Sequence, residues 1–134
     1  KARYMFLGNK DYQQIYLIKK FVKKKFNVKI ISCKTVRYNN LLAYSSRILN
    51  LSYSEKIKAS ILTKELSKTF NKIKKNIKNF KKIKYLKDKF SKSGIKIEYL
   101  EIRNKFNLSK KFNRNNFKLF VAFYINKVRL IDNF

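Results

Sequence analysis

The chain has 134 residues, which is enough for one ordinary domain or for part of a larger one. It carries 35 Lys and Arg residues against 7 acidic ones, for a formal net charge of +28, and it contains no His. The composition therefore excludes an imidazole base and a Ser–His triad, and the scattered acids favour neither a carboxylate pair nor a metal cluster. No apolar run approaches the ~18 residues that span a bilayer, so we expect a cytoplasmic protein.

The positive charge has two interpretations. Lys and Arg displace counterions from phosphate backbones, so a basic RNA-binding or ribosome-associated protein is one alternative. However, most of the basic residues are Lys, Asn is abundant, and the charge is spread along the whole chain. Codon drift in an AT-rich genome produces the same profile without a nucleic-acid partner, and we favour that interpretation.

The first 33 residues predict a strand, a loop, a helix and a second strand. Residues 3–7 are short and mostly apolar, so we expect a buried strand that ends at Gly8. Asp11 can cap the following helix. Residues 28–33 predict a second, parallel strand, with Cys33 as a buried structural thiol. The helix should bury one apolar face, with the lysines at 19–20 and 23–25 outside it; this face comprises Tyr12, Ile15, Ile18, Phe21 and Val22.

This order of elements is typical of the end of a doubly wound sheet. Ligands of such folds lie at the carboxyl ends of the strands. Residues 8–11 and Val36 follow two such ends, so they are candidates for a binding site.

Beyond Arg47 the sequence predicts a small α+β module, with a boundary near residues 48–53. Ser54 and Glu55 should open a helix whose buried side carries Ile57, Ile61, Leu62 and Leu66. Residues 68–89 predict a basic amphipathic helix that ends at Gly94. Its apolar stripe either faces a core or binds a membrane or RNA, and we favour the core. The stripe consists of Phe70, Ile73, Ile77, Phe80, Ile83 and Leu86.

Three strands complete the chain. Residues 95–102 form the first, and residues 117–125 and 128–131 predict a hairpin that turns at Asn126 and Lys127. The expected fold class is α/β: the C-terminal end of a doubly wound, Rossmann-like domain (residues 1–50), then a small α+β domain with a three-stranded sheet (residues 51–134).

Four sequence blocks resemble one enzyme family. Gly8-Asn9-Lys10-Asp11-Tyr12-Gln13-Gln14 is similar to the Gly-Glu-Lys-Asp-Tyr-Gln-Gln motif of pantothenate synthetases (pantoate–β-alanine ligases). Residues 35–37 (Thr-Val-Arg) and 42–47 (Leu-Ala-Tyr-Ser-Ser-Arg) resemble two further stretches at the family's spacing. Residues 99–102 and 129–133 also match. The resemblance covers the whole chain and implies roughly the second half of such an enzyme. Residues 1–50 would then be the C-terminal part of its nucleotide-binding domain, and residues 51–134 its small lid domain.

The resemblance implies that these residues bind ATP and pantoate. The expected ATP contacts are Gly8, Asn9, Lys10, Asp11, Val36, Tyr44, Ser45, Ser46 and Arg47, and Gln14 would bind pantoate. The catalytic set would be Lys10, Ser45, Ser46 and Arg47, with residues 44–47 as a flexible phosphate loop. The family adenylates pantoate, releases pyrophosphate, and then lets the amine of β-alanine displace AMP. Mg²⁺ is expected with ATP, although the chain offers no recognisable ligands, and a homodimer is expected for the complete enzyme.

The chain departs from the family at four positions. Asn9, Lys34, Leu41 and Ile48 stand where the family has Glu, Pro, Gly and Asn. Loss of glycine at position 41 could stiffen or redirect the phosphate loop. The family's His-x-Gly-His motif belongs to its first half and is absent from this chain, so we expect the chain alone to be inactive. A remnant that folds without function is a further alternative.

Overall fold

The computed structural model of the chain describes residues 2–134, except for the side chains of Lys23 and Lys24. It contains two compact units, residues 1–36 and residues 37–134. By their contacts, residues 37–50 belong to the second unit. The boundary predicted at residue 50 refers to the nucleotide-binding domain of a longer protein and stays a prediction.

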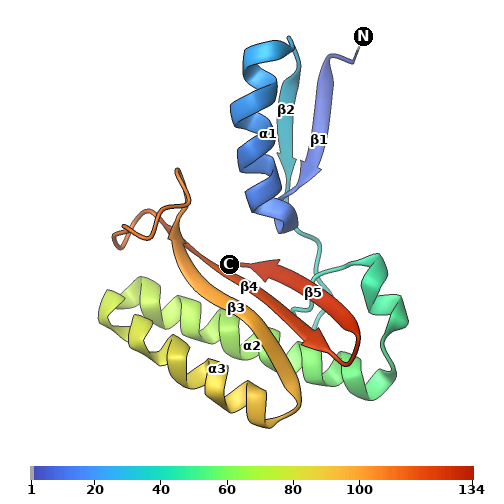
Figure 1. Cartoon of the computed structure of the whole chain (residues 1–134), viewed down its shortest axis with the longest axis vertical. Coiled ribbons are helices and arrows are strands. Elements are labelled where there is room, and N and C mark those ends of the chain that lie inside the picture. Colours follow the sequence, from blue (N-terminus) through green and yellow to red (C-terminus); the bar gives the residue numbers. More distant parts are fainter. Residues whose placement is uncertain (1) are drawn as a thin grey trace. The chain divides into compact units, whose positions relative to one another are not determined.

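The first unit has the predicted strand, loop, helix and strand (Figure 1). Strand β1 (Tyr4–Gly8) is followed by a 3₁₀ turn, η1 (Asn9–Asp11), then by helix α1 (Tyr12–Lys25) and strand β2 (Lys29–Cys33). The two strands are parallel, and Gly8 lies opposite Cys33. The carboxyl ends of both strands therefore lie side by side at one edge, as the sequence predicted.

Burial in the first unit differs from the prediction. Tyr4 and Phe6 are 55% and 65% exposed, so the prediction of a buried first strand is wrong. Phe21 and Cys33 are also exposed, whereas Ile15 of α1 is buried. Alternate side chains of a strand point to opposite faces, and a single helix covers only one face of a two-stranded sheet. The uncovered face therefore keeps its apolar side chains in contact with solvent.

The second unit packs two helices on one face of an antiparallel sheet (Figure 1). A 3₁₀ segment, η2 (Ser46–Asn50), leads to helix α2 (Tyr53–Lys75), a 3₁₀ segment η3 (Ile77–Lys81) and helix α3 (Lys82–Lys92). Strands β3 (Ile95–Asn104), β4 (Phe117–Ile125) and β5 (Val128–Asn133) follow in the order β3-β4-β5. The predicted hairpin turn at Asn126 and Lys127 is confirmed by the pairing of Ile125 with Val128.

The helix boundaries differ from the sequence prediction at two places. Helix α2 begins after Ser52, whose hydroxyl accepts the N–H of Glu55 while the Glu55 carboxylate accepts the N–H of Ser52. The single helix predicted over residues 68–89 is wrong, because the chain leaves the helix at Asn76. The Asn76 side chain accepts the Lys78 N–H at 3.0 Å and so caps η3. Gly94 follows the end of α3 with φ +80°, a left-handed conformation that suits glycine, as predicted.

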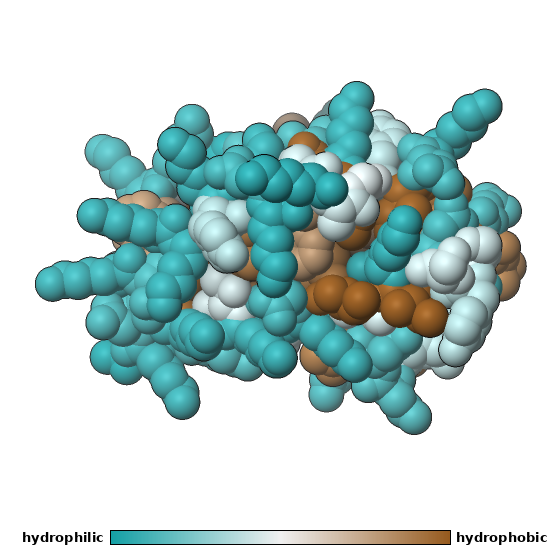
Figure 2. Space-filling view, turned by 90° about the horizontal axis from the view of Figure 1, so that it is seen from below, coloured by the Kyte–Doolittle hydropathy of each residue, from teal (hydrophilic) through white to brown (hydrophobic). Residues whose placement is uncertain are grey.

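The apolar stripe of α2 and α3 faces a core, as predicted. Ile73 and Leu86 are buried there, although Phe80 is 45% exposed, and on α2 Ile57 and Ile61 are exposed instead of buried. Hydrophilic side chains cover most of the face that Figure 2 shows from below. Among the described residues, no helix is both long and apolar enough to cross a membrane. The largest fully buried hydrophobic side chains are Phe123, Leu62, Leu66, Ile73, Ile95, Leu119 and Val121.

Candidate functional site

The first candidate cluster, residues 8–11, lies directly after β1. Gly8 is extended (φ −72°, ψ 128°), and a Cβ atom added there would meet no atom within 4 Å. Packing within the chain therefore does not require a glycine, and the space beside this backbone is open. Asp11 occupies the position before α1, but its side chain makes no capping hydrogen bond. The predicted capping role is wrong, because the exposed carboxylate accepts no N–H from the first turn of the helix.

The other candidates of the first unit lie close to this edge in the chain. Lys10 is half-buried within η1, and Gln14 is exposed in the first turn of α1. Val36 follows β2 and is 67% exposed. Parallel strand ends thus bring residues 8–11 and the segment that leads to Val36 to one edge, where backbone and side chains are open to a ligand.

The second candidate cluster, residues 44–47, is a loop held at both ends by the core of the second unit. Ala43 before it is 4% exposed and Ile48 after it is 2% exposed. The Ser45 hydroxyl accepts the Arg47 N–H at 3.3 Å, and the Ser45 carbonyl accepts the Ile48 N–H at 3.1 Å. Between these anchors Ser46 and Arg47 are exposed. A guanidinium and hydroxyl groups on an anchored loop are donors suited to phosphate oxygens.

Tyr44 opens this loop with a ring contact. Its ring stacks on that of Tyr38, with centroids 3.8 Å apart and planes 19° from parallel. Tyr38 also accepts the Leu41 N–H and donates its own N–H to the Leu42 carbonyl, both at 2.9 Å. Residues 38–41 therefore form a tight turn, and the ring of Tyr38 supports Tyr44, the first residue of the loop at 44–47.

Leu41 closes this turn in a left-handed conformation, with φ 71°. Hairpin turns of this length place glycine at such a position, because an L side chain is strained there by about 1–2 kcal/mol. The Asn40 side chain accepts the Leu42 N–H at 3.2 Å and helps to hold the turn. The chain thus adopts a turn that favours glycine, with Leu41 at the strained position.

Arg37 connects this turn to the last residues of β5. Its Nη1 and Nη2 atoms donate to Asp132 Oδ2 at 2.6 Å and Oδ1 at 2.8 Å. Nη1 also donates to the Leu41 carbonyl at 2.9 Å, and Nη2 to the Asn133 carbonyl at 3.2 Å. The Asp132 side chain is only 5% exposed. Sequence reasoning did not predict this pair; its only signal was that each residue lies in a block resembling the family.

A family model described as pantoate-beta-alanine ligase matches residues 1–134. The chain belongs to this family. It is 37% identical, over its full length, to the pantothenate synthetase of Francisella tularensis subsp. mediasiatica, of which it covers 44%. The chain spans less than half the length of the curated relatives it matches.

Solved structures of ligases of this family agree with the fold. The pantoate-beta-alanine ligase of Francisella tularensis, complexed with beta-gamma ATP and beta-alanine, is 36% identical with a TM-score of 0.76. The match covers 98% of this chain and 43% of that one. The enzyme of Thermus thermophilus is 24% identical with a TM-score of 0.83, over 98% of this chain and 49% of that one. The expected fold class is therefore confirmed.

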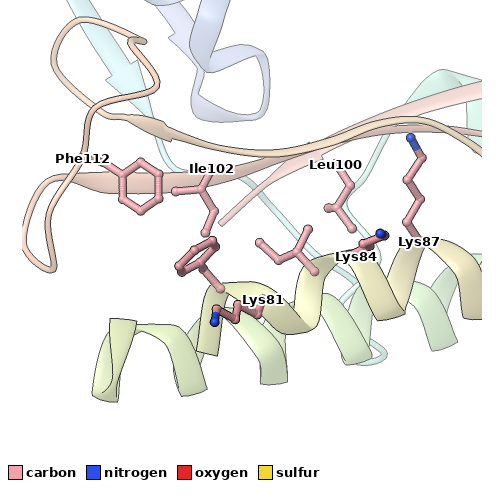
Figure 3. A pocket seen from close by; sticks show the side chains of 8 residues that line it. Lys81, Lys84, Lys87, Leu100, Ile102 and Phe112 are labelled. Carbon is pink, nitrogen blue, oxygen red and sulfur yellow. The ribbon is translucent and has the colours of Figure 1, made fainter. Parts of the chain in front are cut away.

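This member of the ligase family also has an apolar cavity of about 670 Å³ between α3 and β3. Figure 3 shows Leu100, Ile102 and Phe112 beside it, with Lys84 and Lys87 on α3 and Lys81 at the end of η3. None of the predicted site residues lines this cavity. Within residues 2–134 as described, no three His, Cys, Asp or Glu side chains gather to hold a metal ion.

Proposed function

We propose that the complete protein condenses pantoate with β-alanine at the expense of ATP, and that this chain supplies the ATP-phosphate side of the site. The observation that carries the proposal is the family match over the whole chain, together with an anchored loop that exposes Ser46 and Arg47. The Francisella relative bound to an ATP compound and beta-alanine supports the same substrates here.

In the first step, a pantoate carboxylate oxygen attacks the α-phosphorus of ATP. An O–P bond forms, the bond to the pyrophosphate leaving group breaks, and pantoyl adenylate results. Lys10, Ser45, Ser46 and Arg47 would donate to the phosphate oxygens and stabilise the charge that develops on them. Gly8, Asn9, Asp11, Val36 and Tyr44 would hold the nucleotide, and Gln14 would orient pantoate.

In the second step, the amine of β-alanine attacks the acyl carbon of the adenylate. A C–N bond forms, the C–O bond to AMP breaks and its electron pair leaves with the AMP phosphate, and the amine releases its proton to solvent. In both steps, the residues of this chain would act only by positioning the reactants and by stabilising the charge on the phosphate groups. We assign no Mg²⁺ ligand to the described residues and expect the ion to bind through the ATP phosphates.

The activity would require a further segment with the family's His-x-Gly-His motif. The first unit supports this requirement, because β1 exposes Tyr4 and Phe6 and α1 exposes Leu17 and Phe21. Apolar surface of this kind is usually covered by another part of a protein. A homodimer and an AT-rich source genome belong to the same proposal. An in-frame His-x-Gly-His segment in the DNA upstream of the Lys1 codon would support it.

The test is pantoate adenylation by the complete protein, measured as pyrophosphate release. Lys10→Ala and Arg47→Ala should each lower the rate by about 10²-fold or more, the usual loss for a preorganised charge-stabilising donor. Lys75→Ala is the matched control, because Lys75 is exposed on α2 and should change the rate little. Equal rates for Lys10→Ala, Arg47→Ala and Lys75→Ala would contradict the proposed site. Absence of turnover in the complete protein would favour the non-functional remnant.

The second candidate is an RNA-binding protein, favoured by the net charge of +28. If the positive charge results from codon drift, the affinity of the chain for RNA should be weak, independent of the RNA sequence and steeply reduced by salt. ATP binding by the complete protein should survive moderate salt, because directed hydrogen bonds contribute to it. Tight, sequence-selective RNA binding at physiological salt would instead support the RNA-binding candidate.

A further inference from the structure

The second unit also has a concave, basic surface whose lining residues are not among those assigned to ATP. It is a cavity of about 510 Å³ whose lining includes Lys74, Lys105, Arg114 and Lys118. We call it the basic pocket. None of the predicted site residues lines it, and its volume falls within the range of ligand-binding clefts, about 300–1,000 Å³.

Aromatic packing and a backbone contact hold these cations in place. The Phe70 ring meets the Phe117 ring edge to face, with centroids 5.4 Å apart, and Phe134 lies 6.4 Å from Phe70. Lys74 Nζ lies 5.4 Å from the Phe70 centroid, and Arg114 Nε donates to the Lys74 carbonyl at 3.0 Å. The three rings form a hydrophobic wall, which strengthens electrostatic interactions with a bound ion.

Lys118 is the least expected member of the pocket. It lies half-buried on the central strand of the sheet, β4. Burial lowers the pKa of its ammonium group, Asp132 opposes that effect, and Arg37, Lys105 and Lys74 lower the pKa further. The Asp132 carboxylate that opposes the shift also accepts two hydrogen bonds from Arg37.

Codon drift does not account for such a lysine. Drift adds lysines wherever they are tolerated, and an exposed position costs little. A half-buried ammonium among other cations is disfavoured by desolvation and by repulsion. An anion in the cavity would offset both effects at once.

We propose that the basic pocket binds a small polyphosphate anion of the pyrophosphate class. Four cationic side chains around one cavity match an anion with several charged oxygens in a small volume better than an extended nucleic-acid strand. The contacts would be charge-assisted hydrogen bonds from the lysines and the guanidinium. This inference does not depend on the ligase activity, because the two sets of residues are separate.

Isothermal titration of the 134-residue chain with sodium pyrophosphate tests the proposal. Lys118→Met should weaken binding about 10-fold or more, the scale of one lost charge-assisted hydrogen bond. Lys96→Met is the matched control, because Lys96 is an exposed lysine on the neighbouring strand β3, and it should bind like the unchanged chain. Without ligand, Lys118→Met should be at least as stable as the unchanged chain in thermal unfolding. If it does not fold, Lys105→Met serves in its place.

Three results would overturn the inference. Equal affinities for Lys118→Met and Lys96→Met would show that the pocket lysine is not used. Loss of binding in Arg47→Ala with retention in Lys118→Met would place pyrophosphate at the phosphate loop, which would support the proposed function and reject the second site. Tighter binding of a single-stranded oligonucleotide than of pyrophosphate, equally reduced by Lys118→Met, would make the pocket part of a nucleic-acid surface.

Discussion

The two compact units differ in how much of their own apolar surface they bury. Among the described hydrophobic residues of the first unit, Ile15 is buried, while Phe6, Phe21 and Phe26 are each more than 60% exposed. The second unit encloses side chains such as Leu62, Leu119 and Phe123 almost completely. Burial of apolar area is the main favourable term in folding. The second unit therefore buries enough apolar surface to be stable by itself, and the first unit buries much less.

The two candidate clusters reflect this contrast. Residues 8–11 are positioned by a strand end and a single turn of 3₁₀ helix. Residues 44–47 lie between two buried anchors, Ala43 and Ile48, and follow a turn that the Arg37–Asp132 pair fixes. We expect the second cluster to keep its local geometry in the isolated chain more firmly than the first.

The strongest test of this difference in burial compares one buried residue from each unit. Leu62→Ala should lower the free energy of unfolding of the second unit by about 2–5 kcal/mol, because it leaves a cavity in a closed core. Ile15→Ala should leave that transition unchanged. Urea unfolding followed by circular dichroism, with amide exchange to assign the unit, measures both. An equal loss in the two variants would show that the units unfold as one.

Within the second unit, Arg37→Ala should lower the free energy of unfolding by about 3 kcal/mol, because it leaves the buried Asp132 carboxylate without its guanidinium partner. The control is Arg129→Ala, which removes a comparable pair with the exposed Glu98 and should change stability little. Urea midpoints of the two variants provide the measurement. Similar midpoints would argue that the Arg37–Asp132 pair does not hold the turn.

A smaller effect, which stabilises the fold, is expected in the turn at residues 38–41. Leu41→Gly should raise the free energy of unfolding by about 1 kcal/mol, because glycine adopts φ 71° without strain. Leu49→Gly is the matched control: Leu49 is 77% exposed within η2, and glycine there should destabilise the chain. Thermal unfolding compares the two. Destabilisation by both variants would mean that contacts of the Leu41 side chain stabilise the fold by more than the strained backbone at Leu41 destabilises it.

The smallest effect concerns pH. The Ser52 N–H and hydroxyl hydrogen bonds lower the pKa of the Glu55 carboxyl below its ordinary value of 4.5, with a further contribution from Asn126. The folded state therefore binds this proton less readily than the unfolded state. The stabilisation is present above the unfolded pKa and is lost as the pH falls through the folded pKa. Titration of the Glu55 carboxyl by NMR should show the lowered pKa. Ser52→Ala removes the hydroxyl but keeps the N–H, so it should return the pKa part of the way towards 4.5. No shift in Ser52→Ala would contradict the contribution of the Ser52 hydroxyl.

Local patterns in the sequence were sufficient for most elements. Both parallel strands, α1, the hairpin at Asn126 and Lys127 and the end of α3 near Gly94 follow from apolar periodicity and turn residues. The family resemblance likewise depended on short blocks that can be compared residue by residue, and the match over residues 1–134 confirmed it. These features depend on neighbours in the chain, so the sequence alone determined them.

The tertiary structure decided which residues meet and which are covered. Arg37 and Asp132 are 95 positions apart, and no local pattern pairs them. The exposure of Phe6 and Cys33 on the strands and of Phe21 on α1 depends on which faces of the sheet and of the helix have a neighbour, since periodicity shows only that a face is apolar. The break at Asn76 likewise came from a side-chain cap that competed with helix continuation. Contacts between distant segments and the coverage of apolar faces exist only in the folded chain, and for that reason the sequence could not specify them.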